Sequence, residues 1–368
     1  MRSTKAIINL SNLKYNYKNI RKKVKGAKVL AVVKADAYGH GVKESVTALN
    51  SLEKIPEYFG VALTDEGIEV KKLRVKQPIL IFEPLSGENI HDIVKFGLIP
   101  TVFKDEHFRL LKKYSNRKIK VHIKVDTGMG RLGCKFEDSF SFIKRIASHE
   151  FIEIDGVYTH FATSDSSDKI FAKNQLEKFR SLINNLKENQ IQYGLAHCAN
   201  SGAILDMEDS YFDMVRPGIS LYGYYPSLET TESIDLKPVM SIVSKIDSVK
   251  RFRKGESISY GRLFYTNKET TIVTVPIGYA DGYNRNLTNS TYAVIKGKHY
   301  PQVGRVTMDR IMFDVGDDKI KVGESITLLG RDKKLKIDAW DWSKVLNTIP
   351  YEITCGISKR VPRIYKNK

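Results

Sequence analysis

An apolar run ends in a basic side chain near the start of the chain, in the segment VVKADAYGHG that spans residues 32–41. Residues 29–33 are all apolar, which is typical of a strand buried on both faces. An ammonium group at the end of such a strand needs water, a partner or a covalent change. Lys34 is therefore either an ordinary surface lysine or a residue with chemistry of its own.

Polar residues also stand at the ends of other strand-like runs. Each of them alone is a weak signal, since a histidine such as His160 after GVYT is commonly an ordinary polar strand end. In a parallel barrel, however, functional groups gather at the carboxyl ends of the strands. The polar residues found at such ends are Lys34, Asp126, His160, Asn200, Ser201 and Arg216.

Two loops near the end of this first region are suited to phosphate. HCANSG covers residues 197–202 and RPGI covers residues 216–219. The loops after the last two strands of a (β/α)₈ barrel frequently bind phosphate, and glycine lets backbone N–H groups approach an anion closely. A lysine beside a phosphate site suggests a Schiff base, and pyridoxal phosphate is the common cofactor that forms one.

The elements that must position these residues alternate between strand and helix. After a strand over residues 6–10, apolar residues at 13, 17, 20 and 24 form one helical face, with Ser11 as the predicted N-cap and Gly26 as the C-cap. A helix is also predicted over residues 171–188. Strand-like runs follow at residues 29–33, 58–62, 78–82, 98–103, 120–125, 152–160, 192–197 and 212–215. This alternation predicts an α/β fold with a (β/α)₈ TIM-type barrel, and a doubly wound open sheet is the alternative.

The pattern of apolar runs and turns along the sequence changes near residue 236. Short β-branched runs separated by glycine-containing turns predict a mostly β second domain. We therefore expect a barrel domain over residues 1–235 and a β-rich domain over residues 236–368, with the strand at residues 1–10 belonging to either. The predicted strands of the second domain are residues 239–249, 271–275, 292–295, 312–315 and 325–329.

A glycine-rich segment could be mistaken for a dinucleotide fingerprint. Residues 128–133, GMGRLG, match GxGxxG, but Lys124, Asp126 and Thr127 interrupt the apolar lead that this motif requires. An arginine within such a loop is better suited to bind a carboxylate through two hydrogen bonds. Arg131 is thus a candidate for substrate binding.

Composition narrows the classes of partner. The chain has 368 residues and a formal charge of +18, but its 60 Lys and Arg are spread along its length, which favours a solvated surface over nucleic-acid binding. The three cysteines are far apart, so neither a disulfide framework nor a metal clamp is expected. No signal peptide is apparent and no run approaches the ~20 apolar residues of a membrane span. We expect a cytoplasmic protein with no metal, nucleic-acid or membrane partner.

Nine motifs in order resemble the alanine racemase family, the fold-type III pyridoxal phosphate enzymes that racemise alanine. The resemblance runs from about residue 6 to residue 364. The motifs are VVKADAYGHG, KVDTGMGRLG, THFATSD, HCANSGAIL, VRPGISLYG, ISYG, VPIGYADGY, GRVTMD and RVPR.

This resemblance implies a function and a set of site residues. The chain is expected to interconvert L- and D-alanine by a two-base mechanism and to supply D-alanine for bacterial peptidoglycan. Lys34 would carry the cofactor and act as one base, while Tyr260 of ISYG would be the other, contributed across a homodimer. The implied cofactor-binding residues are Lys34, Tyr38, His160, Ser201, Arg216, Gly218, Ile219 and Tyr351.

The remaining implied roles concern the substrate and the entrance. Arg131 and the backbone of Met308 would hold the substrate carboxylate, and His160 would link Tyr260 to Arg216. Lys124 matches a lysine that is often carbamylated in relatives. The implied entrance and support residues are Lys124, Tyr279, Arg285 and Asp309.

Rival functions share parts of this pattern. A fold-type III decarboxylase would resemble a pattern with an acid at the cofactor ring nitrogen, where this chain has Arg216. A pyridoxal phosphate-carrying regulatory protein would resemble the barrel alone. A serine or broader amino-acid racemase stays open, although Tyr279 and Tyr351 favour a small side chain. One departure from the family is Thr307, where several relatives have cysteine.

Overall fold

The computed structural model describes residues 2–114 and 118–367. The chain folds as two compact units. The barrel unit consists of Leu13–Ala37 and Val42–Lys237, and the β unit of Met1–Asn12, Tyr38–Gly41 and Pro238–Lys368. Over the described residues, every helix falls short of the length and apolar character that crossing a bilayer requires.

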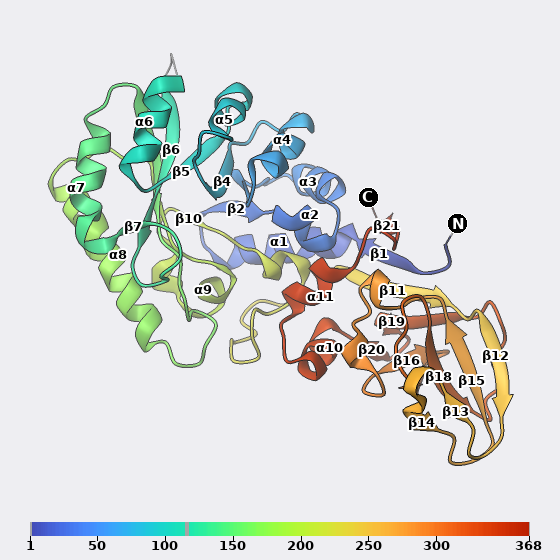
Figure 1. The fold of residues 1–368 in the computed structure, drawn as a ribbon. Coiled ribbons are helices and arrows are strands. Elements are labelled where there is room, and N and C mark those ends of the chain that lie inside the picture. The colour runs from blue at the N-terminus through green and yellow to red at the C-terminus, as the bar shows by residue number, and fades with distance from the viewer. Residues whose placement is uncertain (1, 115–117, 368) are drawn as a thin grey trace. The chain divides into compact units, whose positions relative to one another are not determined.

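Eight parallel strands form the centre of the barrel unit (Figure 1), and most of their side chains are buried, on both faces. The order along the sheet is β10-β2-β3-β4-β5-β6-β8-β9, and a two-residue strand, β7 (Cys134–Lys135), pairs with β6. The eight strands are β2 (Lys28–Val32), β3 (Tyr58–Val61), β4 (Ile79–Pro84), β5 (Ile99–Val102), β6 (Ile119–Asp126), β8 (Ile152–Tyr158), β9 (Leu195–His197) and β10 (Met214–Val215).

The two ends of this sheet are joined by backbone hydrogen bonds. Asp213 N donates to Ala196 O at 3.1 Å, and Arg216 N donates to Ala199 O at 2.8 Å. These bonds connect the segments of β9 and β10, so the sheet curls into a nearly closed barrel. The predicted barrel is confirmed, and the open doubly wound sheet is wrong.

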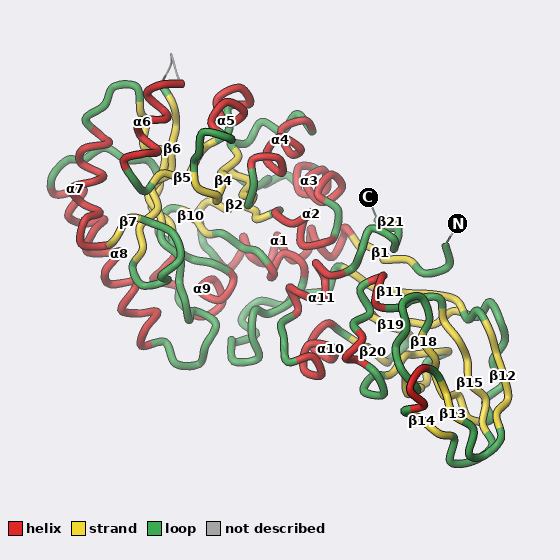
Figure 2. Tube along the Cα trace, viewed as in Figure 1, coloured by secondary structure: helices red, strands yellow, loops and turns green. Residues whose placement is uncertain are grey.

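Helices alternate with these strands along the chain, as Figure 2 shows in red and yellow. The predicted helix over residues 171–188 is confirmed as α8, and its apolar positions 176, 179, 182, 183 and 186 are all buried. The helices are α1 (Leu10–Lys23), α2 (Lys34–Gly39), α3 (Val42–Asn50), α4 (Thr64–Lys72), α5 (Ile90–Phe96), α6 (Asp105–Tyr114), α7 (Phe136–Ala147), α8 (Ile170–Glu188) and α9 (Ser201–Asp206).

Two predicted boundaries are wrong for local reasons. Helix α1 begins at Leu10, so Ser11 lies inside it; the side chain of Asn9 accepts a hydrogen bond from Asn12 N at 3.2 Å and takes the capping role. The last barrel strand has only two residues instead of residues 212–215, because Phe212 has φ +47° and cannot be extended.

The β unit contains a ten-stranded sheet, so the mostly β second region is confirmed. The main order is β12-β15-β18-β17-β16-β19-β11-β1-β21, with β20 paired to β19 and a separate β13–β14 hairpin. The first strand of the chain belongs to this sheet, antiparallel to β11 and parallel to β21. The strand predicted at residues 239–249 is two strands, since β11 ends at Lys245 and β12 begins at Ser248.

The bounds of the remaining elements complete the β unit. The strands are β1 (Lys5–Asn9), β11 (Met240–Lys245), β12 (Ser248–Phe252), β13 (Ser257–Ile258), β14 (Phe264–Tyr265), β15 (Thr270–Val275), β16 (Tyr292–Ile295), β17 (Lys298–Val303), β18 (Ile311–Gly316), β19 (Ser325–Asp332), β20 (Leu335–Ile337) and β21 (Arg363–Lys366). Its two α-helices are α10 (Ala339–Leu346) and α11 (Pro350–Gly356), and both are short.

Candidate functional site

Lys34 follows the buried strand β2 and opens a left-handed turn. The φ angles of Ala35, Asp36, Ala37 and Tyr38 are 52°, 51°, 53° and 55°. Ala37 N donates to Val33 O at 2.9 Å, which closes a helical turn of the unusual hand. An L-residue pays about 1–2 kcal/mol for this conformation, so the backbone just after Lys34 is strained.

Side chains of the barrel unit hold this turn in place. Ala35 N donates to Glu66 Oε1 at 2.7 Å, and Val42 N donates to Asp36 Oδ1 at 2.7 Å. Both acceptors are carboxylates, which form strong hydrogen bonds with backbone N–H groups. These two hydrogen bonds offset the backbone strain and fix the direction in which the chain leaves β2 at Lys34.

Arg216 follows β10 and is 4% exposed. All its hydrogen-bond partners in the described structure are neutral acceptors. One nitrogen, NH1, donates to His197 Nδ1 at 2.7 Å, and NH2 donates to Thr159 O at 2.7 Å, to Cys198 O at 3.1 Å and to His160 Nδ1 at 3.3 Å. Burial lowers the pKa of Arg216, and none of these contacts uses its Nε. The site therefore presents a buried cation whose Nε–H has no acceptor among the contacts of the described residues.

The segments that follow β9 and β10 bring hydroxyl and backbone N–H groups into contact with one another. Ser201 Oγ accepts from Gly218 N at 2.9 Å and from Ser220 N at 3.4 Å, and it lies 3.0 Å from Ser220 Oγ. Ile219 begins the short helix that follows Gly218. The structure thus brings together three of the residues that the sequence predicts for phosphate binding: Ser201, Gly218 and Ile219.

Lys124 lies on β6 and is 5% exposed. Burial, followed by the positive charges of Arg131 and Arg216, lowers the pKa of Lys124 to about 8. Within the described residues its ammonium group makes no ion pair, and it lies 5.5 Å from the centre of the Tyr158 ring. A buried lysine among other cations is partly neutral near pH 8.

The glycine-rich loop after β6 folds around a carboxylate. Asp126 Oδ1 accepts from Gly128 N at 2.9 Å, and Asp126 Oδ2 accepts from Gly130 N at 2.9 Å. The chain then forms β7 before α7, so the segment is no strand–turn–helix unit of the dinucleotide type. Arg131 projects from this loop as an exposed side chain.

The other predicted residues belong to the β unit. Tyr260 is 73% exposed and sits in a turn where Ser259 and Gly261 have φ of 69° and 71°. The ring centres of Tyr38 and Tyr351 are 5.9 Å apart. Arg285 lies in the short helix Arg285–Leu287 and is exposed.

Two loops of the β unit are joined along their backbones. Tyr279 N donates to Thr307 O at 3.0 Å, and Ala280 N donates to Met308 O at 3.2 Å. Gly278 is required here because a Cβ would lie 2.2 Å from Thr307 O. Tyr279, Met308 and Asp309 are therefore held as one group.

Family models match almost the whole chain. The N-terminal domain of alanine racemase matches residues 8–226, and the C-terminal domain of alanine racemase matches residues 239–365. The chain belongs to the alanine racemase family. The resemblance seen in the nine motifs is thereby confirmed, and the chain is classed with enzymes of this activity.

Similar proteins agree with this membership. Alanine racemase 2 of Caldanaerobacter subterraneus subsp. tengcongensis is 41% identical, over 99% of this chain and 95% of its own. The solved alanine racemase of Clostridium difficile 630 is 38% identical with a TM-score of 0.93, covering 99% of this chain and 96% of its own. The alanine racemase of Bartonella henselae, solved with covalently bound pyridoxal phosphate, is 29% identical with a TM-score of 0.89 and matches both chains over their full length.

A buried chain of hydrogen bonds, which we call the histidine relay, is the main feature that the sequence analysis missed. His197 Nε2 lies 2.9 Å from His122 Nδ1, and His122 Nε2 lies 3.3 Å from Asp155 Oδ2. Lys120 and Tyr58 also donate to Asp155, at 2.9 and 2.8 Å. The relay runs from Asp155 through two histidines to Arg216. A possible sequence signal was the spacing of His122 two residues before Lys124, on the same face of β6.

The relay fixes the tautomers of both histidines. Because Arg216 donates to His197 Nδ1, His197 carries its proton on Nε2 and donates it to His122 Nδ1. His122 then carries its proton on Nε2 and donates to Asp155. Burial lowers the pKa of both histidines, which keeps them neutral. Gly156 makes room for the relay, since a Cβ there would lie 2.5 Å from His122 Cε1.

The strained turn gives a test in this racemase-family chain. Ala35→Gly removes the Cβ that disfavours a left-handed residue, and that gain exceeds the entropy lost by glycine. We expect the free energy of unfolding to rise by about 0.5–1 kcal/mol in chemical denaturation. Ala147→Gly, in the right-handed helix α7, is the matched control and should lower it by about 1 kcal/mol. Equal losses in both variants would contradict the assigned strain.

Lys124 makes stability depend on pH. Its folded pKa lies below the ordinary value of 10.5, so the unfolded chain binds more protons between about pH 8 and 10.5, and stability should rise with pH there. In CO₂-free buffer, the free energy of unfolding of the wild type relative to Lys124→Met should rise by about 3 kcal/mol across that window. A difference that stays flat in denaturation curves from pH 7.5 to 10 would contradict this.

Proposed function

We propose that this chain interconverts L- and D-alanine with pyridoxal phosphate as cofactor, using Lys34 and Tyr260 as its two bases. The observation that carries the proposal is Arg216, a buried guanidinium whose contacts are all neutral acceptors. Such a group suits a ring nitrogen that must stay unprotonated, because a permanent positive charge disfavours a second one beside it. Limited electron withdrawal would favour simple return of the proton over transamination.

The residues of the barrel unit fit the cofactor. Lys34 would supply the amine for a covalent attachment. The Ser201 hydroxyl and the N–H groups of Gly218 and Ile219 would donate to a phosphate, with Gly218 N releasing its hydrogen bond to Ser201 Oγ. Tyr38 and Tyr351 of the β unit complete the proposed phosphate-binding set. When bound, pyridoxal phosphate withdraws electrons from the substrate Cα and makes its proton acidic.

Two bases on opposite faces explain inversion of configuration. A proton taken from one face by Lys34 can be replaced on the other by Tyr260, whereas one base would return it to the side it left. Lys34 is held by the strained turn after β2, and Tyr260 by a turn with two positive φ angles. His160, whose pKa is lowered by burial and by Arg216, is proposed to accept from Arg216 while donating toward the tyrosine.

Arg131 of the barrel unit and the N–H of Met308 in the β unit are each proposed as partners of the substrate carboxylate. Within the described residues this N–H donates to no acceptor, although Thr307 N donates to Arg310 O at 3.1 Å. A guanidinium and a free backbone donor are suitable partners for a carboxylate. The proposed entrance consists of Tyr279, Tyr351, Arg285 and Asp309, and its two tyrosines favour a substrate with a small side chain, such as alanine. A serine or broader-specificity racemase is the alternative. Racemase assays with a panel of amino acids would distinguish the two.

We further propose that the active site is shared within a homodimer. Tyr260 is exposed in the β unit, as are Leu263, Tyr265 and Met308, at 73%, 50%, 49% and 51%. Exposed apolar groups of this density are typical of a protein interface. The segments that carry them are linked, since Ser259 Oγ donates to Arg305 O at 2.7 Å. A second copy of the chain would cover this surface and receive the tyrosine.

The setting of the reaction is proposed as the bacterial cytoplasm, where D-alanine would be supplied for peptidoglycan. Cys134 and Cys198 are buried thiols outside any disulfide, and Cys355 is exposed. Burial raises the pKa of the Cys134 and Cys198 thiols, which keeps them unreactive. Buried cysteines that form no disulfide, such as Cys134 and Cys198, are usual in a reducing compartment.

The two bases can be separated by isotope exchange. Tyr260→Phe should lose racemisation by at least about 100-fold, the usual contribution of a general base, while still exchanging the Cα proton of one alanine enantiomer with solvent deuterium. Proton NMR of L- and D-alanine in D₂O, run separately, measures both. Tyr265→Phe, an exposed tyrosine of the same segment, is the matched control. Normal racemisation by Tyr260→Phe would remove the second base from the proposal.

Mixing two inactive variants tests the shared site. In a dimer of Lys34→Ala with Tyr260→Phe, one of the two sites regains both bases if the tyrosine comes from the partner. An equal mixture that exchanges subunits should then recover about a quarter of wild-type activity, since half of the dimers are mixed and each has one intact site. Racemase assays on mixtures and on separate variants measure this. No recovery after proven subunit exchange would place both bases in one chain.

A further inference from the structure

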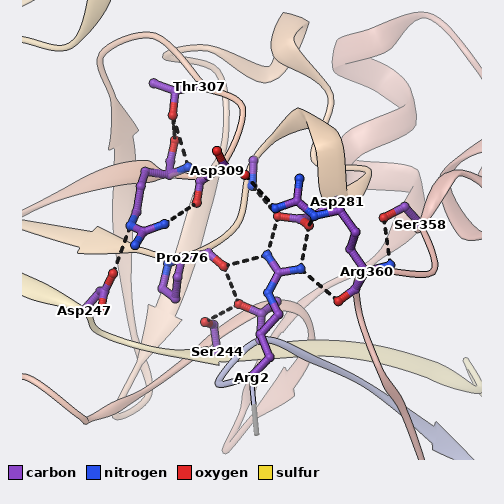
Figure 3. Close-up of polar contacts among 12 residues, drawn as sticks. Arg2, Ser244, Asp247, Pro276, Asp281, Thr307, Asp309, Ser358 and Arg360 are labelled. Atoms are coloured by element: carbon purple, nitrogen blue, oxygen red, sulfur yellow. Dashed lines mark hydrogen bonds and ion pairs between the residues drawn. The ribbon is translucent and has the colours of Figure 1, made fainter.

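Arg2 lies outside every predicted site but makes a dense set of contacts in the β unit (Figure 3). Its NH1 and NH2 donate to Asp281 Oδ1 and Oδ2, both at 2.6 Å. The same guanidinium donates to Arg360 O at 2.9 Å and to Pro276 O at 3.2 Å. A two-pronged pair of this geometry is strong and fixes the orientation of both partners.

Asp281 is fully buried, so its carboxylate oxygens depend on these contacts for their hydrogen bonds. Besides Arg2, its Oδ2 accepts from Gly278 N at 3.0 Å, and its Oδ1 lies 3.3 Å from Arg360 Nε. Its backbone carbonyl accepts from Ser358 N at 3.1 Å. Asp281 therefore ties the start of the chain, the Tyr279 loop and residues 358–360 together.

Arg360 extends the network to the loop that carries Met308. Its NH2 donates to Asp309 Oδ1 at 2.6 Å while its Nε faces Asp281, as Figure 3 shows. Asp309 directly follows Met308, and Thr307 closes the same turn through hydrogen bonds with Arg310. We call the series Arg2–Asp281–Arg360–Asp309 the arginine bridge.

The arginine bridge contacts both of the loops that are joined along their backbones, the Tyr279 loop and the loop that carries Met308. Asp281 orients the Tyr279 loop through Gly278 N, and Asp309 is held directly by Arg360. The backbone bond from Ala280 N to Met308 O joins the two loops. The direction of the Met308 N–H is consequently set by four charged side chains, none of which needs to touch a substrate.

We propose that Arg2 and Arg360 are positioning residues that aim the Met308 N–H at the substrate carboxylate. This inference rests on the proposed function, in which that N–H binds the carboxylate. Because the contact is made equally in the ground state and the transition state, loss of the arginine bridge should weaken substrate binding more than turnover.

Two variants test the arginine bridge while leaving a cation beside the buried Asp281. Arg360→Met removes the link to Asp309 but leaves Asp281 paired with Arg2. Arg2→Lys keeps a cation beside Asp281 but loses the two-pronged geometry. Arg251→Met is the matched control, because Arg251 also bridges two carboxylates, Glu269 and Asp317, on the surface of the β unit with 45% side-chain exposure against 47% for Arg360.

Carboxylate binding is the quantity to measure. For the holoenzyme, KM for L-alanine and the inhibition constant of propionate, a carboxylate without an amine, should rise roughly 3- to 30-fold in Arg360→Met and Arg2→Lys. The value of kcat should change less than about 3-fold. Inhibition by ethylamine, which is alanine without its carboxylate, should stay unchanged, and Arg251→Met should match the wild type in every readout.

The outcomes separate the two levels of inference. A wild type that does not racemise alanine would overturn the proposed function. Racemase activity with unchanged propionate inhibition in both folded variants would overturn the role of the arginine bridge alone. A parallel loss of ethylamine inhibition would also overturn it, because the variants would then disturb the site generally instead of the carboxylate contact.

Discussion

Burial of the Arg216 charge is the constraint on which the candidate site depends. A guanidinium removed from water normally needs a carboxylate, because an unpaired buried ion is costly. Here the first partners are two carbonyls and two imidazoles, and the nearest carboxylate on the relay belongs to Asp155, beyond His197 and His122. Two neutral rings thus separate the opposite charges. The arrangement keeps negative charge away from the place where a ring nitrogen would bind while still balancing the cation.

The relay also explains why Asp155, in the middle of β8, is charged. Burial alone would raise the pKa of Asp155, but hydrogen bonds from His122, Lys120 and Tyr58 lower it, so the carboxylate stays charged. A charged Asp155 holds the proton of His122 on Nε2 and, through it, keeps His197 Nδ1 free to accept from Arg216. Asp155, in the middle of β8, therefore determines which atoms of His197 can accept a hydrogen bond from Arg216.

The sequence predicted what depends on periodicity and local motifs, and it failed where three-dimensional partners decide. Eight apolar runs predicted the barrel. The polar residues that follow these runs, among them Lys34, Ser201 and Arg216, were predicted as site residues. Asn9 displaced Ser11 as the cap because its side chain meets Asn12 N, which apolar spacing does not report. Two alanines, Ala35 and Ala37, lie in the left-handed turn after Lys34, and alanine does not indicate a positive φ angle. The residue types therefore could not predict this turn. The relay and the arginine bridge join residues 19 to 279 positions apart, beyond any local pattern.

The departure of Thr307 from the family pattern is consistent with a substrate contact made by backbone. Its hydroxyl accepts from Arg310 N at 3.1 Å and donates to Arg310 O at 2.8 Å, closing the turn from within. Its carbonyl accepts from Tyr279 N. None of these three hydrogen bonds requires the Thr307 side chain to face a ligand. What the loop must preserve is the path of the chain around Met308, set by Gly278 on one side and Asp309 on the other. A side chain at position 307 can change as long as the turn stays closed.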